Sequence, residues 1–275
     1  MALTKTATTV PGARDSDAAV YPVRRVTTDD LKASLRDGYR DFTEHRGDLI
    51  FIGLIYPLIG LVAAGAALGG TLSHYFFPIA FGVALLGPVA ATGFYEIARR
   101  NEEGLDSDWS HFLDIVKRPS FDSITAVVAL LLVIFGFWIA VAGLLYAGII
   151  GAPPARAGEF LERLFTTSEG WSLIAIGNLV GLAFAVLVLA VSVVSLPMLV
   201  DRDIGARAAV ATSVASVRAN FGVMFLWGLS VLALLVLGSL PLFVGLAFVL
   251  PWLGYSTWHL YTRTVDRSVL PPPTE

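Results

Sequence analysis

Long uncharged apolar runs constrain this chain more than any other feature of its sequence. From Phe221 to Tyr261 the chain contains no Lys, Arg, Asp or Glu over about 40 residues, and a membrane-spanning helix needs about 20 apolar residues. The composition agrees, because 56% of the residues are apolar and only 15% are charged, a balance outside the usual range of soluble domains. The sequence therefore predicts an all-α, polytopic membrane protein.

Six apolar runs are long enough to span a bilayer, and they divide the chain into three regions. The predicted spans are residues 49–69, 75–98, 123–150, 171–199, 221–239 and 241–262. Residues 1–26 are small, polar and proline-containing, which predicts a disordered tail. The membrane domain then covers residues 27–265, and residues 266–275 form a second tail.

The basic residues predict the orientation of these spans. Lysine and arginine in short loops stay on the cytoplasmic side during membrane insertion. Of the 19 basic residues, 17 fall on the side that carries both termini, and only Arg156 and Arg163 fall on the other. We therefore expect a multi-pass protein of the bacterial inner membrane with its N and C termini in the cytoplasm.

An internal repeat is the most informative pattern, because many membrane folds arose by duplication of a helical unit. Each of three units has an amphipathic segment, a basic residue before the bilayer, a span, and a return span containing proline. The basic residues are Arg46, Arg118 and Arg218, and the prolines, which we expect to kink the return helices, are Pro88, Pro197 and Pro251. The middle unit is imperfect, because Asp201 follows its proline after only four residues.

Apolar side chains at helical spacing predict the amphipathic segments, which lead into or lie between the spans. They are Leu31, Leu35, Tyr39 and Phe42; then Trp109, Phe112, Leu113 and Val116; then Phe160, Leu161, Leu164 and Phe165; and finally Ile204, Ala208, Ala211, Val214 and Val217. Whether these segments bind lipid or pack on the bundle stays open at this point. Trp109, Trp171, Trp252 and Trp258 are expected to anchor at the membrane boundaries.

Four segments resemble a bacterial family of integral membrane proteins, domain of unknown function 2189. They are GPVAATGFYEIARR from Gly87, VVSLPMLVDRD from Val193, TSVASVRAN from Thr212 and LPWLGYSTWHLY from Leu250. The resemblance extends over residues 25–265 and implies a six-helix inner-membrane protein. Some relatives carry a label that links them to cytochrome c oxidase, but the family offers no catalytic residues to transfer.

The histidines argue against a haem–copper role, because such enzymes hold haem iron with histidines inside membrane helices. None of the four histidines falls at the middle of a predicted span, and His259 lies near the inner end of the last one. Cysteine is absent, which excludes thiolate nucleophiles and Cys-ligated metals. The sequence also lacks a glycine-rich phosphate loop, HExxH and a nucleophile elbow. We expect no enzyme activity, no cofactor, no metal site and no nucleic-acid partner.

A few polar residues within or beside the apolar runs are the candidate functional positions. Glu96 is an acidic residue in an otherwise apolar run, which suggests cation binding or proton relay; pairing with Arg99 and Arg100 is the structural alternative. Asn178 suggests either a solute path or an interhelical hydrogen bond.

Asp201 and Asp203 suggest a surface cation site. The alternative gives Asp203 the role of N-cap for a helix starting at Ile204, with Arg202 or Arg207 as ionic partners.

Three functions are compatible with these features of the sequence. The leading hypothesis is a non-enzymatic accessory or assembly protein of a membrane complex, with a membrane-protein partner or a second copy of itself in the lipid bilayer. The alternative is a small-solute transporter or channel built from the three hairpins. A weaker reading is an enzyme acting on a lipid head group, and its only support is the Asp201-Arg202-Asp203 triplet.

Overall fold

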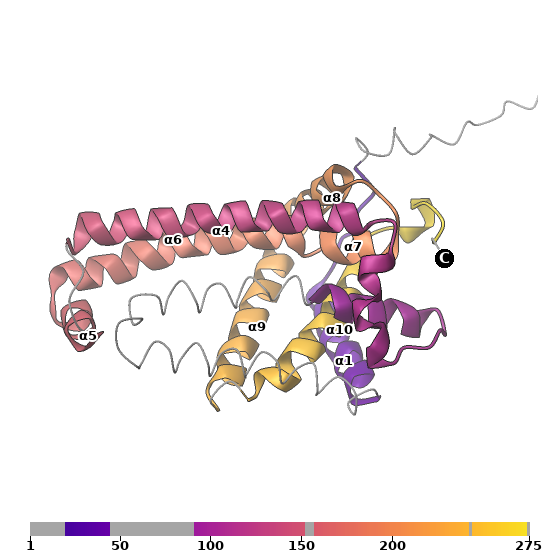
Figure 1. The fold of residues 1–275 in the computed structure, drawn as a ribbon, viewed down its shortest axis with the longest axis horizontal. Coiled ribbons are helices and arrows are strands. Elements are labelled where there is room, and N and C mark those ends of the chain that lie inside the picture. The colour runs from indigo at the N-terminus through magenta and orange to yellow at the C-terminus, as the bar shows by residue number, and fades with distance from the viewer. Residues whose placement is uncertain (1–19, 45–90, 152–156, 242–243, 274–275) are drawn as a thin grey trace, which may run out of the picture.

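The computed structural model describes residues 20–44, 91–151, 157–241 and 244–273, and this part of the chain is helical apart from loops and one isolated β-bridge. Figure 1 shows two long helices side by side, with shorter helices gathered near one of their ends. The predicted span 49–69, most of span 75–98, and Pro88 lie outside the described residues.

Three of the described helices are long and apolar enough to cross a membrane. They are α4 (Phe121–Ile149), α6 (Ser168–Ser192) with its continuation α7 (Ser195–Asp201), and α9 (Phe221–Ser239). They agree closely with the predicted spans 123–150, 171–199 and 221–239.

The predicted span 241–262 has a different outcome. The helix there, α10, covers Leu246–Thr264 and is not among the three membrane-crossing candidates. It begins five residues later than predicted, and its second half includes Ser256, Thr257, His259 and Arg263. Because of these polar residues, α10 is less hydrophobic than the prediction of a membrane span required.

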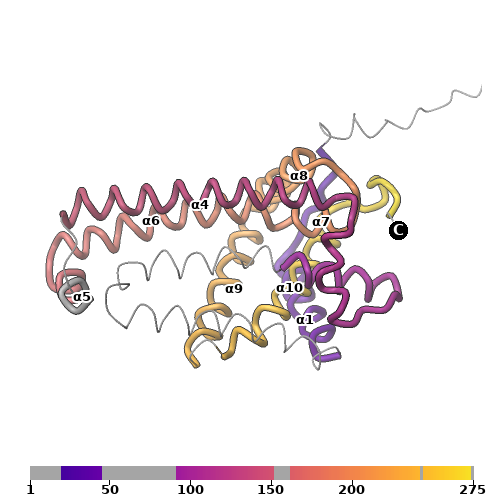
Figure 2. The backbone as a smooth tube through the Cα atoms, in the orientation of Figure 1, coloured from indigo at the N-terminus to yellow at the C-terminus, as the bar shows by residue number. Residues whose placement is uncertain are grey.

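The long helices α4 and α6 form an antiparallel pair, and α5 (Ala157–Thr166) packs against α6 at their far tip (Figures 1 and 2). The start of α4, the end of α7, the start of α9 and the end of α10 lie together at the opposite end (Figure 1). We call this the polar end. It also holds α1 (Thr28–Glu44), the helix 91–102, α8 (Ala206–Ala219) and two 3₁₀ helices, η3 (Trp109–Lys117) and η4 (Arg267–Val269).

The helix containing Pro197 is broken rather than smoothly kinked. Helix α6 ends at Ser192, two turn residues follow, and Pro197 lies in the first turn of α7. Proline has no N–H to continue the helical ladder. The Val194 N–H, which the break frees, donates to the Ser213 hydroxyl of α8 at 3.2 Å. Pro251 lies inside α10, and the kink predicted there stays a prediction.

Residues 20–26 are ordered, so the predicted disordered tail 1–26 is wrong for these residues. Val23 forms an antiparallel bridge with Val265. The Tyr21 N–H donates to the Thr212 hydroxyl at 3.1 Å, and the Val26 N–H donates to the Asn220 side-chain oxygen at 2.9 Å. Backbone pairing and the side chains of Thr212 and Asn220 therefore fix a segment whose local composition gives no helical or strand period.

The predicted apolar faces of two amphipathic segments are partly confirmed, because Leu31 and Phe42 of α1 and Ala208 and Val217 of α8 are buried. The buried face of α8 also contains Thr212, Ser213 and Ser216. The Ser213 hydroxyl accepts from the α6–α7 break and the Thr212 hydroxyl accepts from Tyr21, whereas Ser216 donates to the Thr212 carbonyl of its own helix. Trp258 is buried and Trp252 is half-buried, so neither is free to anchor in lipid. Trp252 instead donates to the Leu35 carbonyl of α1 at 2.8 Å.

Helix α1 lies against α10 with very little space between the two backbones. A Cβ atom added at Gly38 would lie 2.5 Å from the Ser256 nitrogen and 2.6 Å from its Cα. Only glycine at position 38 therefore permits this approach.

We expect Gly38→Ala to lower the free energy of unfolding by about 1–3 kcal/mol, the usual cost of overpacking. Equilibrium unfolding of the full chain in mild detergent measures this change. Gly136→Ala in α4 is the matched control, because its Cβ would meet nothing within 4 Å and both substitutions share the same gain in helix propensity. Equal stability of the two variants would contradict the close approach.

Candidate functional site: linked ion-pair clusters at the polar end

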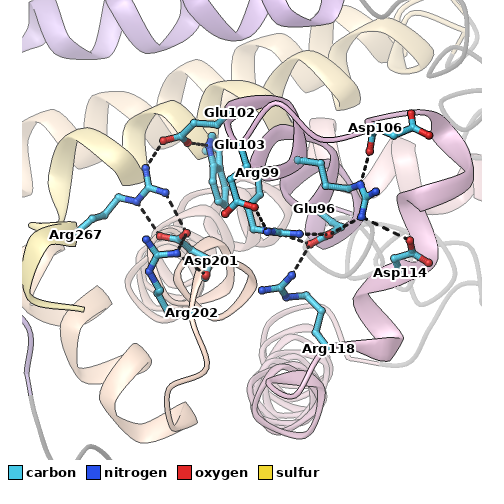
Figure 3. Close-up of polar contacts among 12 residues, drawn as sticks. Glu96, Arg99, Glu102, Glu103, Asp106, Asp114, Arg118, Asp201, Arg202 and Arg267 are labelled. Carbon is cyan, nitrogen blue, oxygen red and sulfur yellow. Dashed lines mark hydrogen bonds and ion pairs between the residues drawn. The ribbon is translucent and has the colours of Figure 1, made fainter. Parts of the chain in front are cut away.

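The first cluster surrounds Glu96, which lies in the helix 91–102 and is 1% exposed. Arg99 donates to both carboxylate oxygens of Glu96, from Nη2 at 2.7 Å and from Nε at 3.1 Å. Arg118 lies 3.5 Å away and Arg100 lies 4.0 Å away (Figure 3). The predicted pairing with Arg99 and Arg100 is therefore confirmed, and Arg118 is an additional partner.

The arginines around Glu96 are themselves close to one another. Burial, and then the positive charge of Arg99, lower the pKa of Arg118, while Glu96 opposes the shift. Arg99 also pairs with Glu103, one turn further along the helix. The Glu96 carboxylate therefore offsets the repulsion among the buried arginines, which is a structural role. Removing this carboxylate would be costly, because it would leave buried cations without their counter-charge.

The second cluster surrounds Asp201, the last residue of α7, which is fully buried. Arg267 donates to both carboxylate oxygens, from Nε at 2.9 Å and from Nη2 at 3.1 Å. The Tyr261 hydroxyl donates at 2.6 Å, and the Arg202 guanidinium lies 3.0 Å from Oδ1. The predicted pairing with Arg202 is confirmed. The bidentate pairing with Asp201, however, comes from Arg267, in the segment predicted to be a tail.

Glu102 connects the Asp201 cluster to the helix 91–102. It accepts a hydrogen bond from Trp258 Nε1 at 2.9 Å and pairs with Arg267, as Figure 3 shows. The Arg267 guanidinium also lies 5.8 Å from the centre of the Trp258 ring, a distance typical of a cation–π contact. One arginine thus joins the helix 91–102, α7 and α10.

A third group of charges joins α1 to α10 around a polar cavity of about 510 Å³. His259 lies 2.6 Å from the Asp41 carboxylate, and Arg263 pairs with Asp37. The remaining lining residues are Ala98, Asn101, Glu102, Trp258 and Thr262. Glu102 therefore belongs both to the wall of this cavity and to the Asp201 cluster.

The other predicted site residues do not join these clusters. Asp203 is exposed, and α8 begins at Ala206 with Gly205 as its N-cap, so the predicted N-cap role of Asp203 is wrong. Asn178 is exposed and donates to the Ile174 carbonyl of its own helix at 2.7 Å. The predicted interhelical hydrogen bond is therefore not formed among the described residues.

The chemistry of these clusters is that of fixed ion pairs. Within the described ranges, no group of three or more His, Asp or Glu side chains is arranged to hold a metal ion. Glu96 and Asp201 both have arginine partners at hydrogen-bond distance. Their carboxylates are thereby engaged in holding helices together.

The His111 imidazole lies on the surface of this end, where two carboxylates raise its pKa. The hydrogen bond with Asp114, 2.6 Å away, is the main cause; burial opposes it, Asp106 adds to it, and Arg100 opposes it. A raised pKa means that this pair stabilises the fold below the unfolded-state pKa of about 6.5 and that the contribution is lost as pH rises through the folded pKa.

We expect a two-dimensional NMR titration of His111 to give a pKa above 6.5 in the wild-type protein, with Asp114→Asn returning it toward the ordinary value. Asp108→Asn is the control, because His111 takes its shift from other carboxylates. An unchanged His111 pKa in Asp114→Asn would contradict the assignment.

Comparison with known families matches residues 76–201 to DUF2189, described as a predicted integral membrane protein. This range contains Glu96, Arg118 and Asp201, and it is narrower than the resemblance over residues 25–265. No curated protein and no solved structure matches the chain. Over residues 76–201 the chain is therefore similar to the DUF2189 family of predicted integral membrane proteins.

Proposed function

We propose that the protein is a non-enzymatic accessory or assembly scaffold of another membrane complex. The observation that carries this proposal is the engagement of Glu96 and Asp201 by arginines in a dry setting. Glu96 and Asn178 line neither the polar cavity between α1 and α10 nor the apolar cavity between α6, α9 and α10. Glu96 and Asp201 thus hold helices together, and Asn178 bonds only within its own helix, which favours a rigid scaffold.

The proposed topology is six spans in three hairpins, in the bacterial inner membrane, with both termini in the cytoplasm. The distribution of 17 of 19 basic residues supports it. The polar end supports it further, because α4 and α9 begin there and α7 and α10 end there (Figure 1). We assign the polar end to the cytoplasmic side.

The apolar faces of the long helices would provide the surface for a partner. Leu132, Val133 and Leu144 on α4 are all more than half exposed, as are Leu179 on α6 and Leu232 on α9. Lipid covers such faces equally well, so association in the membrane depends on packing and not on hydrophobicity alone. The partner we propose is an apolar membrane protein, with the respiratory link coming from the family resemblance.

Oxygen consumption by membranes from a deletion strain tests this function. We expect a lower oxidase-dependent rate and less assembled oxidase on native gels, both restored by the wild-type chain. Full respiration and normal complex levels in the deletion strain, with the protein purifying alone in several mild detergents, would overturn the proposal.

A small-solute transporter is the alternative, and the charged cavity between α1 and α10 is the observation that favours it. Flux of a broad solute panel into proteoliposomes would test it, with His259→Ala as the cavity variant and Asn178→Ala as the surface variant. Flux that falls in His259→Ala but not in Asn178→Ala would support transport. Absence of flux in the wild-type protein would remove this alternative.

A further inference from the structure

The segment between the helix 91–102 and α4 departs from the predicted amphipathic α-helix. Gly104 has a φ of 68°, and the Leu105 N–H donates back to the Arg100 carbonyl at 2.9 Å, an arrangement that ends a helix. The following turns, η3, form a 3₁₀ helix. Side chains three residues apart are eclipsed in such a helix, so η3 has three distinct faces.

Two of these faces are occupied by the protein itself. Phe112 and Ile115 point to the bundle: Ile115 is 7% exposed, and the Phe112 ring lies 5.0 Å from the Phe94 ring in an edge-on contact. The second face is polar, because Asp114 pairs with both His111 and Lys117. The predicted common face of Trp109, Phe112, Leu113 and Val116 is therefore wrong, because it assumed the α-helical period.

The third face carries apolar side chains that contact little of the described protein. Leu113 on this face is 67% exposed and Val116 is 53% exposed. Trp109 begins η3 in line with Phe112 and Ile115 but is itself 55% exposed. We call Leu113 and Val116, together with the exposed Trp109 at the start of η3, the η3 apolar face. Large apolar side chains grouped on one short rigid element mark an interaction surface more often than isolated ones do.

The position of η3 in the chain indicates what covers this face. Lys117 ends η3, and Phe121 begins α4, one of the helices able to cross a membrane. In the turn between them, Arg118 pairs with Glu96 and Ser120 is buried. The η3 apolar face therefore lies next to the point where the chain enters the bilayer. Tryptophan favours this interfacial zone, and a polar ladder on a neighbouring face is typical of interfacial segments.

We propose that η3 is a membrane-surface anchor, which inserts Trp109, Leu113 and Val116 into the lipid headgroup region beside α4. The inference is independent of the proposed scaffold function, since it requires only that α4 spans the membrane. It separates the amphipathic segments into two kinds, because α1 and α8 bury their faces within the protein whereas η3 turns one outward. The anchor fixes the depth at which the polar end sits relative to the bilayer.

The absence of cysteine allows a direct test by single-site labelling of the full chain. Leu113→Cys and Val116→Cys would each carry an environment-sensitive fluorophore in vesicles of phosphatidylcholine and phosphatidylglycerol. We expect blue-shifted emission, loss of more than half of the fluorescence with nitroxide on shallow lipid positions, and little quenching by aqueous iodide. Lys32→Cys, on the exposed side of α1, should show the opposite pattern, and Val133→Cys in α4 should respond to deep nitroxides.

Two outcomes would overturn the anchor. Iodide quenching of the Leu113 and Val116 labels equal to that of the Lys32 label would place the face in water. Protection from iodide without quenching by lipid nitroxides would show that protein covers the face, either a second copy or a partner. Because both labelled positions are exposed, unchanged circular dichroism and size-exclusion elution are expected and would confirm that each variant is folded.

Discussion

Asp201→Asn is expected to lower the free energy of unfolding by about 3–5 kcal/mol, the cost of removing one partner from a buried ion pair. The substitution leaves the Arg267 and Arg202 guanidinium groups without the carboxylate that they share. Tyr261 would also donate to an amide oxygen in place of a charged one. Unfolding in mild detergent, followed by circular dichroism, measures the loss.

Asp203→Asn is the matched control, two residues away and exposed. We expect it to change stability by less than about 0.5 kcal/mol, as surface substitutions usually do. Comparing the two variants tests where each aspartate lies in the fold, because both belong to the same triplet in the sequence. Similar losses in both variants would contradict the central position of Asp201.

Glu96→Gln is expected to cost about 3 kcal/mol, again because buried cations lose their counter-charge. Gln keeps the side-chain volume, so the change isolates the charge that faces Arg99 and Arg118, whose side chains are 6% and 8% exposed. Thermal and chemical unfolding of the detergent-solubilised protein would measure this loss.

Glu103→Gln serves as the comparison, since Glu103 is more exposed and contacts Arg99; we expect it to cost at most about 1 kcal/mol. Combining Glu96→Gln with Arg118→Gln should recover part of the stability, because the double variant removes one of the uncompensated charges. Additive losses in the double variant would argue that Arg118 and Glu96 do not interact.

The parts of this fold that the sequence predicted are those governed by local composition. Helices α4, α6 and α9 follow directly from the length of uncharged runs, and Glu96 finds Arg99 and Arg100 because residues three and four apart share a helix face. The N-cap role considered for Asp203 rested on residue type alone, whereas α8 begins at Ala206 after Gly205 and contacts the α6–α7 break through Ser213.

The missed site residues are those whose partners lie far away in the chain. Arg118 reaches Glu96 across a turn and a 3₁₀ helix, and Arg267 reaches Asp201 over 66 residues. One signal was present for Arg118, which the repeat singled out as the basic residue before a span. Its counterpart Arg218 is exposed, so the two units use this position differently. The threefold repeat stays a prediction.

The distance in sequence between Asp201 and Arg267 has a consequence for how the polar end forms during synthesis. Translation makes Asp201 together with Arg202 but adds Arg267 only 66 residues later. Until then the Asp201 carboxylate of the nascent chain lacks its bidentate arginine partner. The helix α10 and the helix 91–102 likewise lack the guanidinium that joins them. The ion pairs of the polar end are thus completed late in synthesis. A chain released before Arg267 would contain its membrane helices but lack the arginine that joins their ends.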